Sequence, residues 1–424
     1  MSGVGVVFKF FEYWEQRERE ELIAKDPEAI EGWDTNLFNY LDLVALGQIS
    51  DMMFMETLEN RFICEYGLDY INNGFISELV KKQAFSLFGI PVEKFNESYF
   101  KELTQIGVAF YIAPLINALI RVGNEIEKTR LFQAFITPQM EVPSTKRGEK
   151  GLVETIATQS ARNCTNAKAR QNKEKEKAID LLNIQIINNC LDENKILILN
   201  ADDLNVSNTL TGLCAMGVAA EHKKPVMLGR ISPDGYLKGS IRGREESELK
   251  DFKAFLNSSG LMDYVEGHPN AAGFSIKVSD IDKLTEFANK ELANINFNEG
   301  FYEADFIVKG NCSYLSDMIE DLDRGRRLYG QGNDEPIVVV EDITINCNSI
   351  EIIGKNNDTV RFNFNGVTYI KFKAKDLINE IQKYSGKINI VAAGHASVNH
   401  WGGMSKPQIL LDEIEIKECS DLDF

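Results

Sequence analysis

The sequence lacks several features that define common functional classes. Its seven cysteines are scattered and none forms a CxxC pair, which argues against a disulfide framework and against structural zinc. No GxxxxGK[ST] phosphate loop occurs, so a nucleotide-driven motor is not expected. We see no apolar run of membrane-span length, and the first residues run from apolar to charged, opposite to a signal peptide. These absences favour a cytoplasmic protein outside the membrane.

Positive charge is also scarce. The formal net charge is −18, the wrong sign for a protein that simply coats nucleic acid. The basic residues nevertheless gather in groups, and each group is either a solvated helix face or a track for phosphates. The groups are Lys146, Arg147, Lys150, Arg162, Lys168, Arg170, Lys173, Lys175 and Lys177; Arg242 and Arg244; and Arg324, Arg326 and Arg327.

Hydrophobic periodicity predicts a helical first third of the chain. Residues 1–145 are expected to be mostly helical, with one helix over Asn36–Gln48 that ends near Asp51 and another over Leu58–Ile71. Gly47 in the first of these predicts a close approach by another segment. Residues 146–190 are expected to form a connector, a polar loop followed by a long charged helix.

The rest of the chain is richer in strands. Residues 191–298 alternate short apolar runs (KILIL, PVMLG, GFSIK) with helical spacing in EESELKDFKAFLNSSG, an α/β pattern. Residues 299–424 read as strands separated by turns such as GKNND and NFNGV. A small barrel of the oligonucleotide-binding (OB) kind is expected there, with a β-sandwich as the alternative. The fold class is therefore α/β and multidomain.

Eight segments resemble, in order and over nearly the whole chain, those of RecJ-type single-strand DNA exonucleases of the DHH phosphoesterase superfamily. They are SGVGVVFKF, LDLVALGQISDMM, LENRFICEYGL, IAPLINALIRVG, NAKARQNKEKE, KGSIRG, EGHPNAAGFSI and LYGQGNDEP. The resemblance implies that residues 1–145 are the C-terminal remainder of a DHH domain and 146–190 a connector helix. It implies a DHH-associated substrate-binding domain at 191–298 and an OB-like domain at 299–424.

The resemblance also implies hydrolysis of phosphodiester bonds by two divalent metals, manganese or magnesium. In the family the ligands come from a DxD motif, a separate Asp, the DHH triplet and the Asp of the LDLVALG segment. Only the last has a counterpart here, Asp51, and none of the four His lies in a DHH triplet. Because one carboxylate cannot hold two metals, we expect little or no nuclease activity from this chain alone.

A partner would then be needed to complete the site. We expect a complementary N-terminal polypeptide of DxD–DHH type, which would cover an apolar face at the start of the chain. That face is made of Val4, Val6, Val7, Phe8, Phe10 and Phe11.

Substrate residues follow from the same motifs. The resemblance implies recognition of a 5′ end and 5′-to-3′ polarity on single-stranded DNA. Ser240 and Arg242 match a GSxR pair, and an Arg fork suits a terminal phosphate. Asn117 and Arg121 match positions of a PRINAAGR-like segment. In EGHPNAAG, His268 is expected to donate to a phosphate or to the scissile group. Small residues of the same segment let a backbone approach closely; they are Gly267, Ala271, Ala272 and Gly273.

Three departures from the family pattern indicate a divergent member, as a phage or mobile element would carry. Leu115 replaces an Arg, and Glu266 replaces a Gly. NADDLNVSNTLTG stands where the family has a WHPGVIG-like segment, and its Asp202 and Asp203 are expected in a turn or helix cap.

Aromatic residues near the C-terminus suggest stacking surfaces for bases. The candidates are Tyr369, Phe372 and Trp401, of which Trp401 in the polar turn NHWGG fits an exposed contact best. Alternating aromatics in VRFNFNGVTYIKF fit a barrel core better than a stacking platform.

Two functions therefore stay open. One is part of a RecJ-like exonuclease acting in repair, recombination or phage replication. The other is a non-catalytic module that binds single-stranded DNA or a protein partner.

Overall fold

A computed structural model describes residues 1–26, 36–202, 204, 207–297, 303–354, 356–401 and 404–418, with the side chains of Asn36, Trp401, Met404 and Glu418 left out. The chain forms two compact units. Unit 1 comprises Met1–Pro114, Ala134–Ala161 and Glu303–Phe424, and unit 2 comprises Leu115–Gln133 and Arg162–Tyr302. The four-part division expected from the sequence does not coincide with these two units, and its boundaries stay a prediction.

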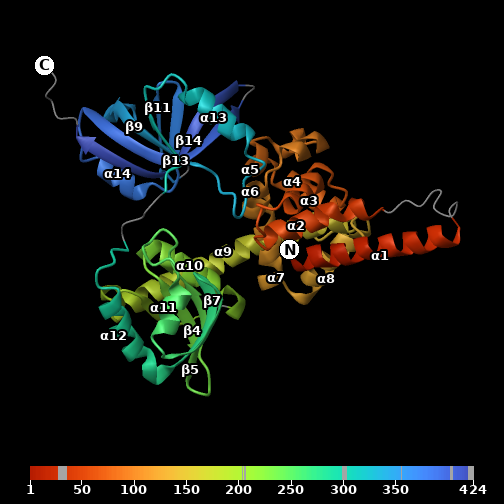
Figure 1. Ribbon diagram of the computed structural model, residues 1–424, viewed down its shortest axis with the longest axis horizontal. Coiled ribbons are helices and arrows are strands. Elements are labelled where there is room, and N and C mark those ends of the chain that lie inside the picture. Colours follow the sequence, from red (N-terminus) through yellow and green to blue (C-terminus); the bar gives the residue numbers. More distant parts are fainter. Residues whose placement is uncertain are drawn as a thin grey trace. The chain divides into compact units, whose positions relative to one another are not determined.

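The first part of unit 1 is helical, as expected (Figure 1). Its two predicted helices appear as α2 (Leu41–Ser50), preceded by a 3₁₀ turn, and α3 (Leu58–Asp69). The other elements are α1 (Gly3–Lys25), α4 (Gly74–Lys82), α5 (Ala84–Phe88), the 3₁₀ helix η4 (Glu97–Glu102), α6 (Gln105–Gly107), the π-helical turn η5 (Val108–Ile112), and strands β1 (Glu141–Pro143) and β2 (Val153–Thr155). Most of α7 (Ala113–Val122) and of α8 (Glu125–Ile136) belongs to unit 2.

Helix α1 packs closely on α2. A Cβ atom added at Gly47 would lie 2.1 Å from Val4 Cγ1, so glycine is required for this approach, which the sequence had suggested without naming the neighbour. At the start of α1 the Ser2 N–H donates to Gln48 Oε1 at 2.8 Å, and the Ser2 hydroxyl accepts from the Gly5 N–H. The N-terminus of α1 is thus tied to the end of α2 that carries Asp51.

One apolar stretch corrects the reading of the sequence. Gln105–Val122, which runs through α6, η5 and α7, has the length of a membrane span and a mean hydropathy of 1.5 over its 18 residues. Ile112, Ala118 and Leu119 within it are fully buried. Because buried core helices pass the same test of length and composition, the stretch is weak evidence for a membrane segment.

The second part of unit 1 is a seven-stranded sheet of order β10-β11-β12-β14-β13-β9-β8. Its core includes Phe362 stacked on Tyr369, with ring centroids 4.9 Å apart. Among the strands that the structure describes, the outermost two, β8 and β10, do not pair, so the sheet is OB-like without being a closed barrel. The elements are β8 (Phe306–Lys309), α13 (Leu315–Arg324), β9 (Ile337–Asn346), β10 (Glu351–Ile353), β11 (Thr359–Phe364), β12 (Val367–Lys371), α14 (Lys375–Ile381), β13 (Lys387–Trp401) and β14 (Met404–Glu418).

Unit 2 has a five-stranded sheet of order β3-β4-β5-β7-β6, covered by helices on both faces. Val226 and Leu228 of β4 pack against α9 and α10, whereas Met227 packs on the opposite side with α11 and α12. Because strand β4 is buried on both of its faces, its PVMLG run is apolar throughout and does not alternate with polar residues. The elements are α9 (Ile156–Asn188), β3 (Leu197–Asn200), α10 (Thr211–His222), β4 (Val226–Ile231), β5 (Tyr236–Arg242), α11 (Phe252–Ser258), β6 (Met262–His268), β7 (Ala271–Lys277) and α12 (Ile281–Glu291).

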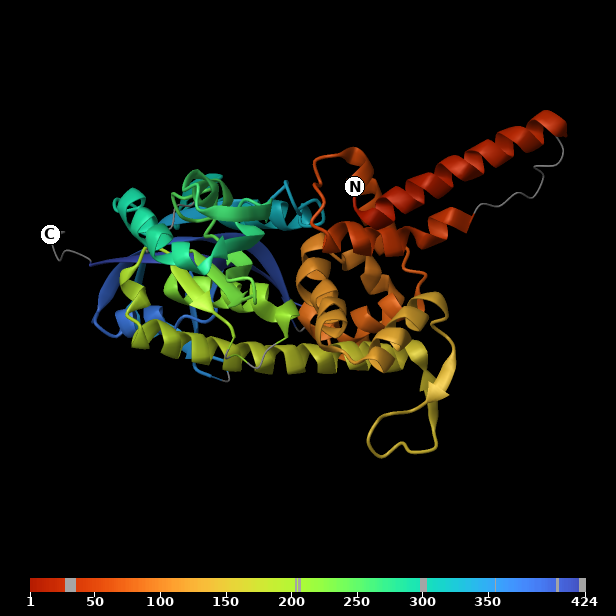
Figure 2. The ribbon, with the colours of Figure 1, turned by 90° about the horizontal axis from the view of Figure 1, so that it is seen from below.

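Helix α9 contains the long charged segment expected as a connector (Figure 2). It begins earlier than the charged sequence suggested, at Ile156, directly after a short hairpin of β1 and β2. That hairpin lies where the sequence indicated a polar loop. Helix α11 is shorter than its sequence pattern indicated, because the polar residues EESELK that precede it are not helical.

Candidate functional site

Asp51 lies at the C-terminal end of α2, with an exposed carboxylate. Its backbone N–H donates to the Gly47 carbonyl at 3.0 Å. A buried chain of hydrogen bonds fixes this end of the helix, since Gln48 Nε2 donates to Asn60 Oδ1 at 3.0 Å and Asn60 Nδ2 donates to the Phe54 carbonyl at 2.8 Å. The ENR segment therefore supports the loop around Asp51.

A two-metal site does not fit the residues around Asp51. In the described parts of the chain, no three His, Cys, Asp or Glu side chains lie together in a way that could hold a metal ion. Two adjacent divalent ions require several hard oxygen or imidazole ligands, and Asp51 supplies one. The described residues alone therefore do not make the metal centre that the family resemblance implies.

The two glycine-containing motifs of unit 2 meet on adjacent strands. Strand β5 carries GSIR and β7 carries AAG, and their register places Ser240 opposite Gly273 and Arg242 opposite Ala271. Strand β6 pairs with the other edge of β7, where His268 lies opposite Ala271. Residues far apart in the sequence are thus brought to one end of the sheet.

The EGHPNAAG turn has an unusual backbone. Gly267 has φ +134°, a conformation that residues with a side chain rarely adopt, and it pairs with Ala272. His268 and Glu266 are both exposed on β6. His268 is therefore accessible to a ligand, while Glu266 places a carboxylate where the family has a glycine.

Helix α10 begins beside the guanidinium of Arg242. A Cβ atom at Gly212 would lie 2.5 Å from Arg242 Nη2 and 3.5 Å from Ser240 Oγ. No side-chain hydrogen bond caps the first turn of this helix, although the Thr211 N–H already donates to the Asn208 carbonyl. Arg242 is half-buried, and its Nη1 donates to the Ile241 carbonyl at 2.6 Å.

More cations converge on the same point. Burial and the nearby charge of Arg121 lower the pKa of Arg242. Burial, Lys175 and Arg121 lower the pKa of Lys168. The Thr209 hydroxyl donates to the Arg121 carbonyl at 3.2 Å, which links the start of α10 to α7. We call Arg121, Lys168, Lys175, Ser240, Arg242 and the N-terminus of α10 the basic pocket.

Asn117 lies one turn before Arg121 on α7 and is half-buried, so the two share one face of the helix. The structure thus places Arg121 near the GSIR motif, and the role of these residues in substrate binding stays a prediction. The sequence named Lys168 and Lys175 only as members of a larger basic group, and it did not single out Gly212. A signal for Gly212 existed, because TLTG in the divergent segment is followed by an apolar helical pattern.

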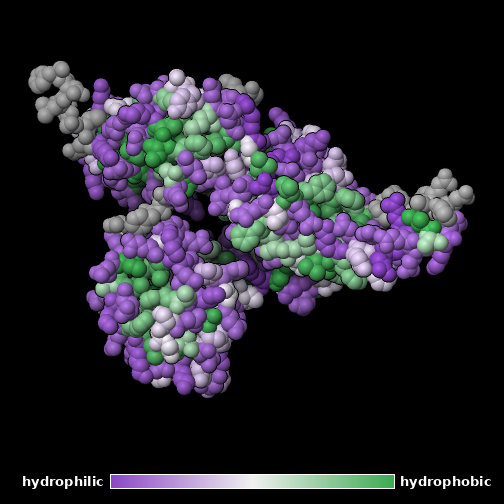
Figure 3. All heavy atoms as spheres, viewed as in Figure 1, coloured by the Kyte–Doolittle hydropathy of each residue, from purple (hydrophilic) through white to green (hydrophobic). Residues whose placement is uncertain are grey.

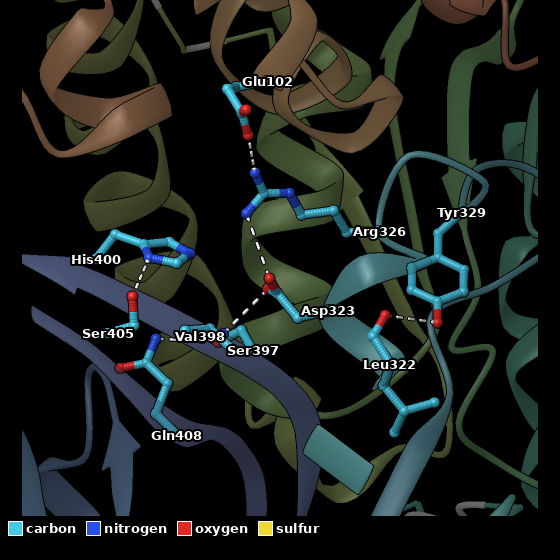
Figure 4. A network of polar contacts seen from close by, with 10 residues as sticks. All are labelled: Glu102, Leu322, Asp323, Arg326, Tyr329, Ser397, Val398, His400, Ser405 and Gln408. Atoms are coloured by element: carbon cyan, nitrogen blue, oxygen red, sulfur yellow. Dashed lines mark hydrogen bonds and ion pairs between the residues drawn. The ribbon is translucent and has the colours of Figure 1, made fainter. Parts of the chain in front are cut away.

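Two arginines of the basic group at the end of α13 are engaged in ion pairs within the protein, which disfavours the phosphate-track alternative for them. Arg326 lies between Glu102 and Asp323, and Asp323 also accepts from the Val398 N–H at 3.0 Å (Figure 4). Arg327 pairs with Asp69 at 2.7 Å.

Two other arginines have similar partners. Arg324 pairs with Asp321 at 2.7 Å. Arg244 donates to the Phe297 carbonyl at 2.7 Å. Arg244 is therefore engaged within the protein and is a poor candidate for binding DNA, whereas Arg324 is 73% exposed in a surface pair.

The aromatic residues that the sequence suggested for base stacking differ in burial. Tyr369 is fully buried in the core of unit 1, so it is no stacking surface. Phe372 is 62% exposed and remains available for stacking. The side chain of Trp401 lies outside the described residues. Asp202 lies in a turn after β3 and accepts from the Ile231 N–H, as expected, and Asp203 lies outside the described residues.

An apolar surface extends along α1. Phe8 is buried, but Val6, Val7, Phe10, Phe11 and Trp14 each have more than half of their surface exposed. Figure 3 shows hydrophobic residues among the polar ones over the N-terminal part of α1 and the neighbouring α2. Such a surface is typical of a site for a protein partner.

Comparisons with known proteins agree with these features. The family described as RecJ OB domain matches residues 312–413. The putative SPbeta prophage-derived single-strand DNA-specific exonuclease YorK of Bacillus subtilis (strain 168) is 33% identical to this chain, over 98% of the chain and 68% of YorK. The single-stranded-DNA-specific exonuclease RecJ of the same organism is 24% identical over 99% of this chain and 47% of RecJ.

The fold of this chain also matches that of a solved RecJ structure. The crystal structure of RecJ in complex with Mn2+ from Thermus thermophilus superposes with a TM-score of 0.60 and 20% identity, over 90% of this chain and 50% of that chain. This chain therefore spans about half the length of the RecJ proteins that it matches. The identity to YorK along almost the entire chain establishes that the protein belongs to the family of the RecJ and YorK single-strand DNA-specific exonucleases.

Proposed function

We propose that this chain is the substrate-binding portion of a 5′-to-3′ single-stranded DNA exonuclease, and that the basic pocket holds the 5′-terminal phosphate. The observation that carries the proposal is the position of Arg242 beside the start of α10, where the Arg121 backbone is also held by Thr209. The names of the relatives supply the substrate class, single-stranded DNA.

The electrostatics of the basic pocket favour an anion. The charges that act on Arg242 and Lys168 are those of other cations, and burial adds to the cost of keeping both groups charged. A bound phosphate would offset that repulsion, because guanidinium groups and helix N–H groups both donate to its oxygens. A terminal phosphate suits the pocket better than an internal one, because it offers an additional oxygen and charge.

We propose that Asp51 contributes one ligand to a metal centre whose other ligands come from a DxD–DHH polypeptide. The Thermus RecJ structures, which hold Mn2+ or Mg2+, favour one of these ions. The apolar face of α1 is the surface on which such a polypeptide would dock. His268 and Asn117 would contact the DNA backbone, and Gly267 and Ala271–Gly273 would let it approach. Since the described residues do not complete the centre, we derive no chemical step through the metals.

The alternative is an accessory module that binds single-stranded DNA without cutting it. The isolated position of Asp51 and the paired arginines of α13 are compatible with it. Both functions use the basic pocket, and they differ in whether cleavage occurs when the missing ligands are supplied. The likeness to a prophage-derived relative favours a phage setting over general repair or recombination, in the cytoplasm.

Binding is the first test. Fluorescence anisotropy would compare a single-stranded oligonucleotide bearing a 5′ phosphate with the same oligonucleotide bearing a 5′ hydroxyl. We expect wild-type protein to prefer the phosphate, and Arg242→Ala to lose the preference. Lys238→Ala, an exposed change on the same strand, is the matched control. Equal binding of the two oligonucleotides by wild-type protein would refute the assignment of the pocket.

Cleavage is the second test. The chain alone, and the chain mixed with a DxD–DHH polypeptide, would be assayed with Mn2+ on 5′-phosphorylated single strands. Activity in the mixture that Asp51→Ala abolishes supports the exonuclease. Activity of the chain alone that survives Asp51→Ala contradicts the role of Asp51. Tight binding without cleavage in either sample favours the accessory module.

A further inference from the structure

A cavity of about 490 Å³ lies in unit 1 next to the end of α2. We call it the Met-lined cavity, after its lining by Met52, Met53, Met55, Gln105, Phe110 and Glu335. Its volume is within the range of small-molecule sites in proteins, and its walls are largely apolar with a few polar groups. Ile49 and Met52 both line it, so Asp51 lies at its margin.

Two irregular backbone segments border this cavity. Met52 has φ +53°, a left-handed conformation that is strained for a residue with a side chain. Ala109 and Phe110 lie in the π-helical turn η5, which interrupts the helix between α6 and α7. Such strain and π turns occur disproportionately at functional sites.

The third irregularity indicates the chemistry of a ligand. Gln105 is 3% exposed, and its Nε2 donates to the Arg327 carbonyl at 3.3 Å. Its Oε1 is buried without any hydrogen-bond partner. Since a buried acceptor without a donor costs free energy, the cavity is suited to a ligand that brings a hydrogen-bond donor to this oxygen.

The charges around the cavity exclude a phosphate as its occupant. Asp334 and Glu335 line it. His395, the one imidazole there, is held by the Asp412 carboxylate at 3.1 Å and the Pro336 carbonyl at 3.3 Å. The lining therefore offers acceptors and negative charge, which suits a neutral amino group and repels an anion.

We propose that the Met-lined cavity binds an amino-bearing base of single-stranded DNA (adenine, cytosine or guanine), with Gln105 Oε1 accepting a hydrogen bond from the exocyclic amine. The inference rests on the proposed function for its substrate class. Methionine and phenylalanine side chains contact the flat faces of a base favourably, and thymine has no amine to offer Gln105. A base held in the cavity, with Asp51 at its margin, helps to position the DNA backbone near this proposed metal ligand.

The test is a position scan. A 5′-phosphorylated oligothymidine is compared by fluorescence anisotropy with versions carrying one deoxyadenosine or one deoxycytidine at successive positions. We expect one position at which the amino-bearing base strengthens binding by about fivefold or more, the effect of roughly one added hydrogen bond. Gln105→Met removes the acceptor and Ala109→Leu fills the cavity, so both variants should give a flat scan.

Controls separate this inference from the proposed function. Ala254→Leu, the same substitution at an exposed site on α11, should keep the position preference. Preference for a 5′ phosphate over a 5′ hydroxyl, measured on the same oligonucleotides, should persist in every variant. A flat scan in wild-type protein with the phosphate preference intact overturns the cavity assignment alone. The same holds if the position preference persists in folded Gln105→Met and in folded Ala109→Leu. Loss of the phosphate preference in wild-type protein overturns the proposed function instead.

Discussion

Gly212→Ala offers a sharp test of the basic pocket, because it should affect stability and binding in opposite directions. The added methyl group would lie 2.5 Å from Arg242 Nη2 and 3.2 Å from Arg242 Cζ. Both atoms belong to the flexible end of a side chain, so the guanidinium can retreat at little cost. Retreat by roughly 1 Å restores ordinary van der Waals contact.

The size of each effect follows from this geometry. Moving the guanidinium away from the start of α10 removes a hydrogen bond to a charged ligand, which contributes about 1.5–3 kcal/mol. Binding of a 5′-phosphorylated oligonucleotide should therefore weaken by roughly ten- to hundredfold. Alanine meanwhile stabilises a helix relative to glycine by about 0.5–1 kcal/mol, so the free energy of unfolding should rise or stay unchanged.

The assay combines fluorescence anisotropy with urea unfolding. Gly217→Ala is the contrasting variant, since its methyl group would lie 2.3 Å from Ile179 Cδ1, between α10 and α9. Overpacking there should lower the free energy of unfolding by about 1–3 kcal/mol and leave the phosphate preference of the folded protein intact. Unchanged affinity of Gly212→Ala for 5′-phosphorylated DNA would refute Arg242 as a phosphate ligand.

Three further predictions concern unit 1. Gly47→Ala should detach α1 from α2, and circular dichroism should show lower helicity or a lower melting temperature; an unchanged melting curve would contradict the packing. The hydrogen bond to Asp412 raises the pKa of His395 above its ordinary value of 6.5. Protonated His395 therefore stabilises the folded protein fully below pH 6.5, and this contribution is lost as pH rises through the raised pKa. His395→Gln should therefore flatten the fall in the free energy of unfolding above pH 6.5, and an unaltered slope would refute this. Arg327→Ala should lower the free energy of unfolding by about 1 kcal/mol, measured in urea, because the pair with Asp69 is about a quarter exposed; no loss would mean that the pair is fully screened.

Much of the fold was predictable from sequence, because periodic apolar residues report directly on buried faces. The stretch Asn36–Gln48 and the PVMLG run are examples of a helix and a strand found in this way. Elements whose formation depends on distant partners were harder to predict. The hairpin of β1 and β2 has little apolar pattern of its own, so the sequence around it read as a loop.

The candidate site was predictable only in part. Ser240, Arg242 and Arg121 followed from motifs, and the structure groups them. Lys168 belongs to a basic group that the sequence assigned either to a solvated helix face or to a phosphate track, and nothing in the sequence distinguishes it from the other cations of that group. The structure was also needed to distinguish the paired Arg326 and Arg327 from the arginines of the basic pocket. Their acidic partners lie more than 200 positions away in the sequence.

The π-helical turn Val108–Ile112 has a consequence for how this protein can vary. A π turn accommodates one more residue than an α turn, so deleting one residue there would restore a regular helix. The residues after the π turn would then keep nearly the same orientation, because the turn holds the extra residue within about the same rotation around the helix axis. A deletion within α7 before Arg121 would instead rotate every later residue by about 100° and turn Arg121 away from its present neighbours. The π turn is therefore the place where this segment can change its length without disturbing the basic pocket, and relatives should vary in length there rather than in α7.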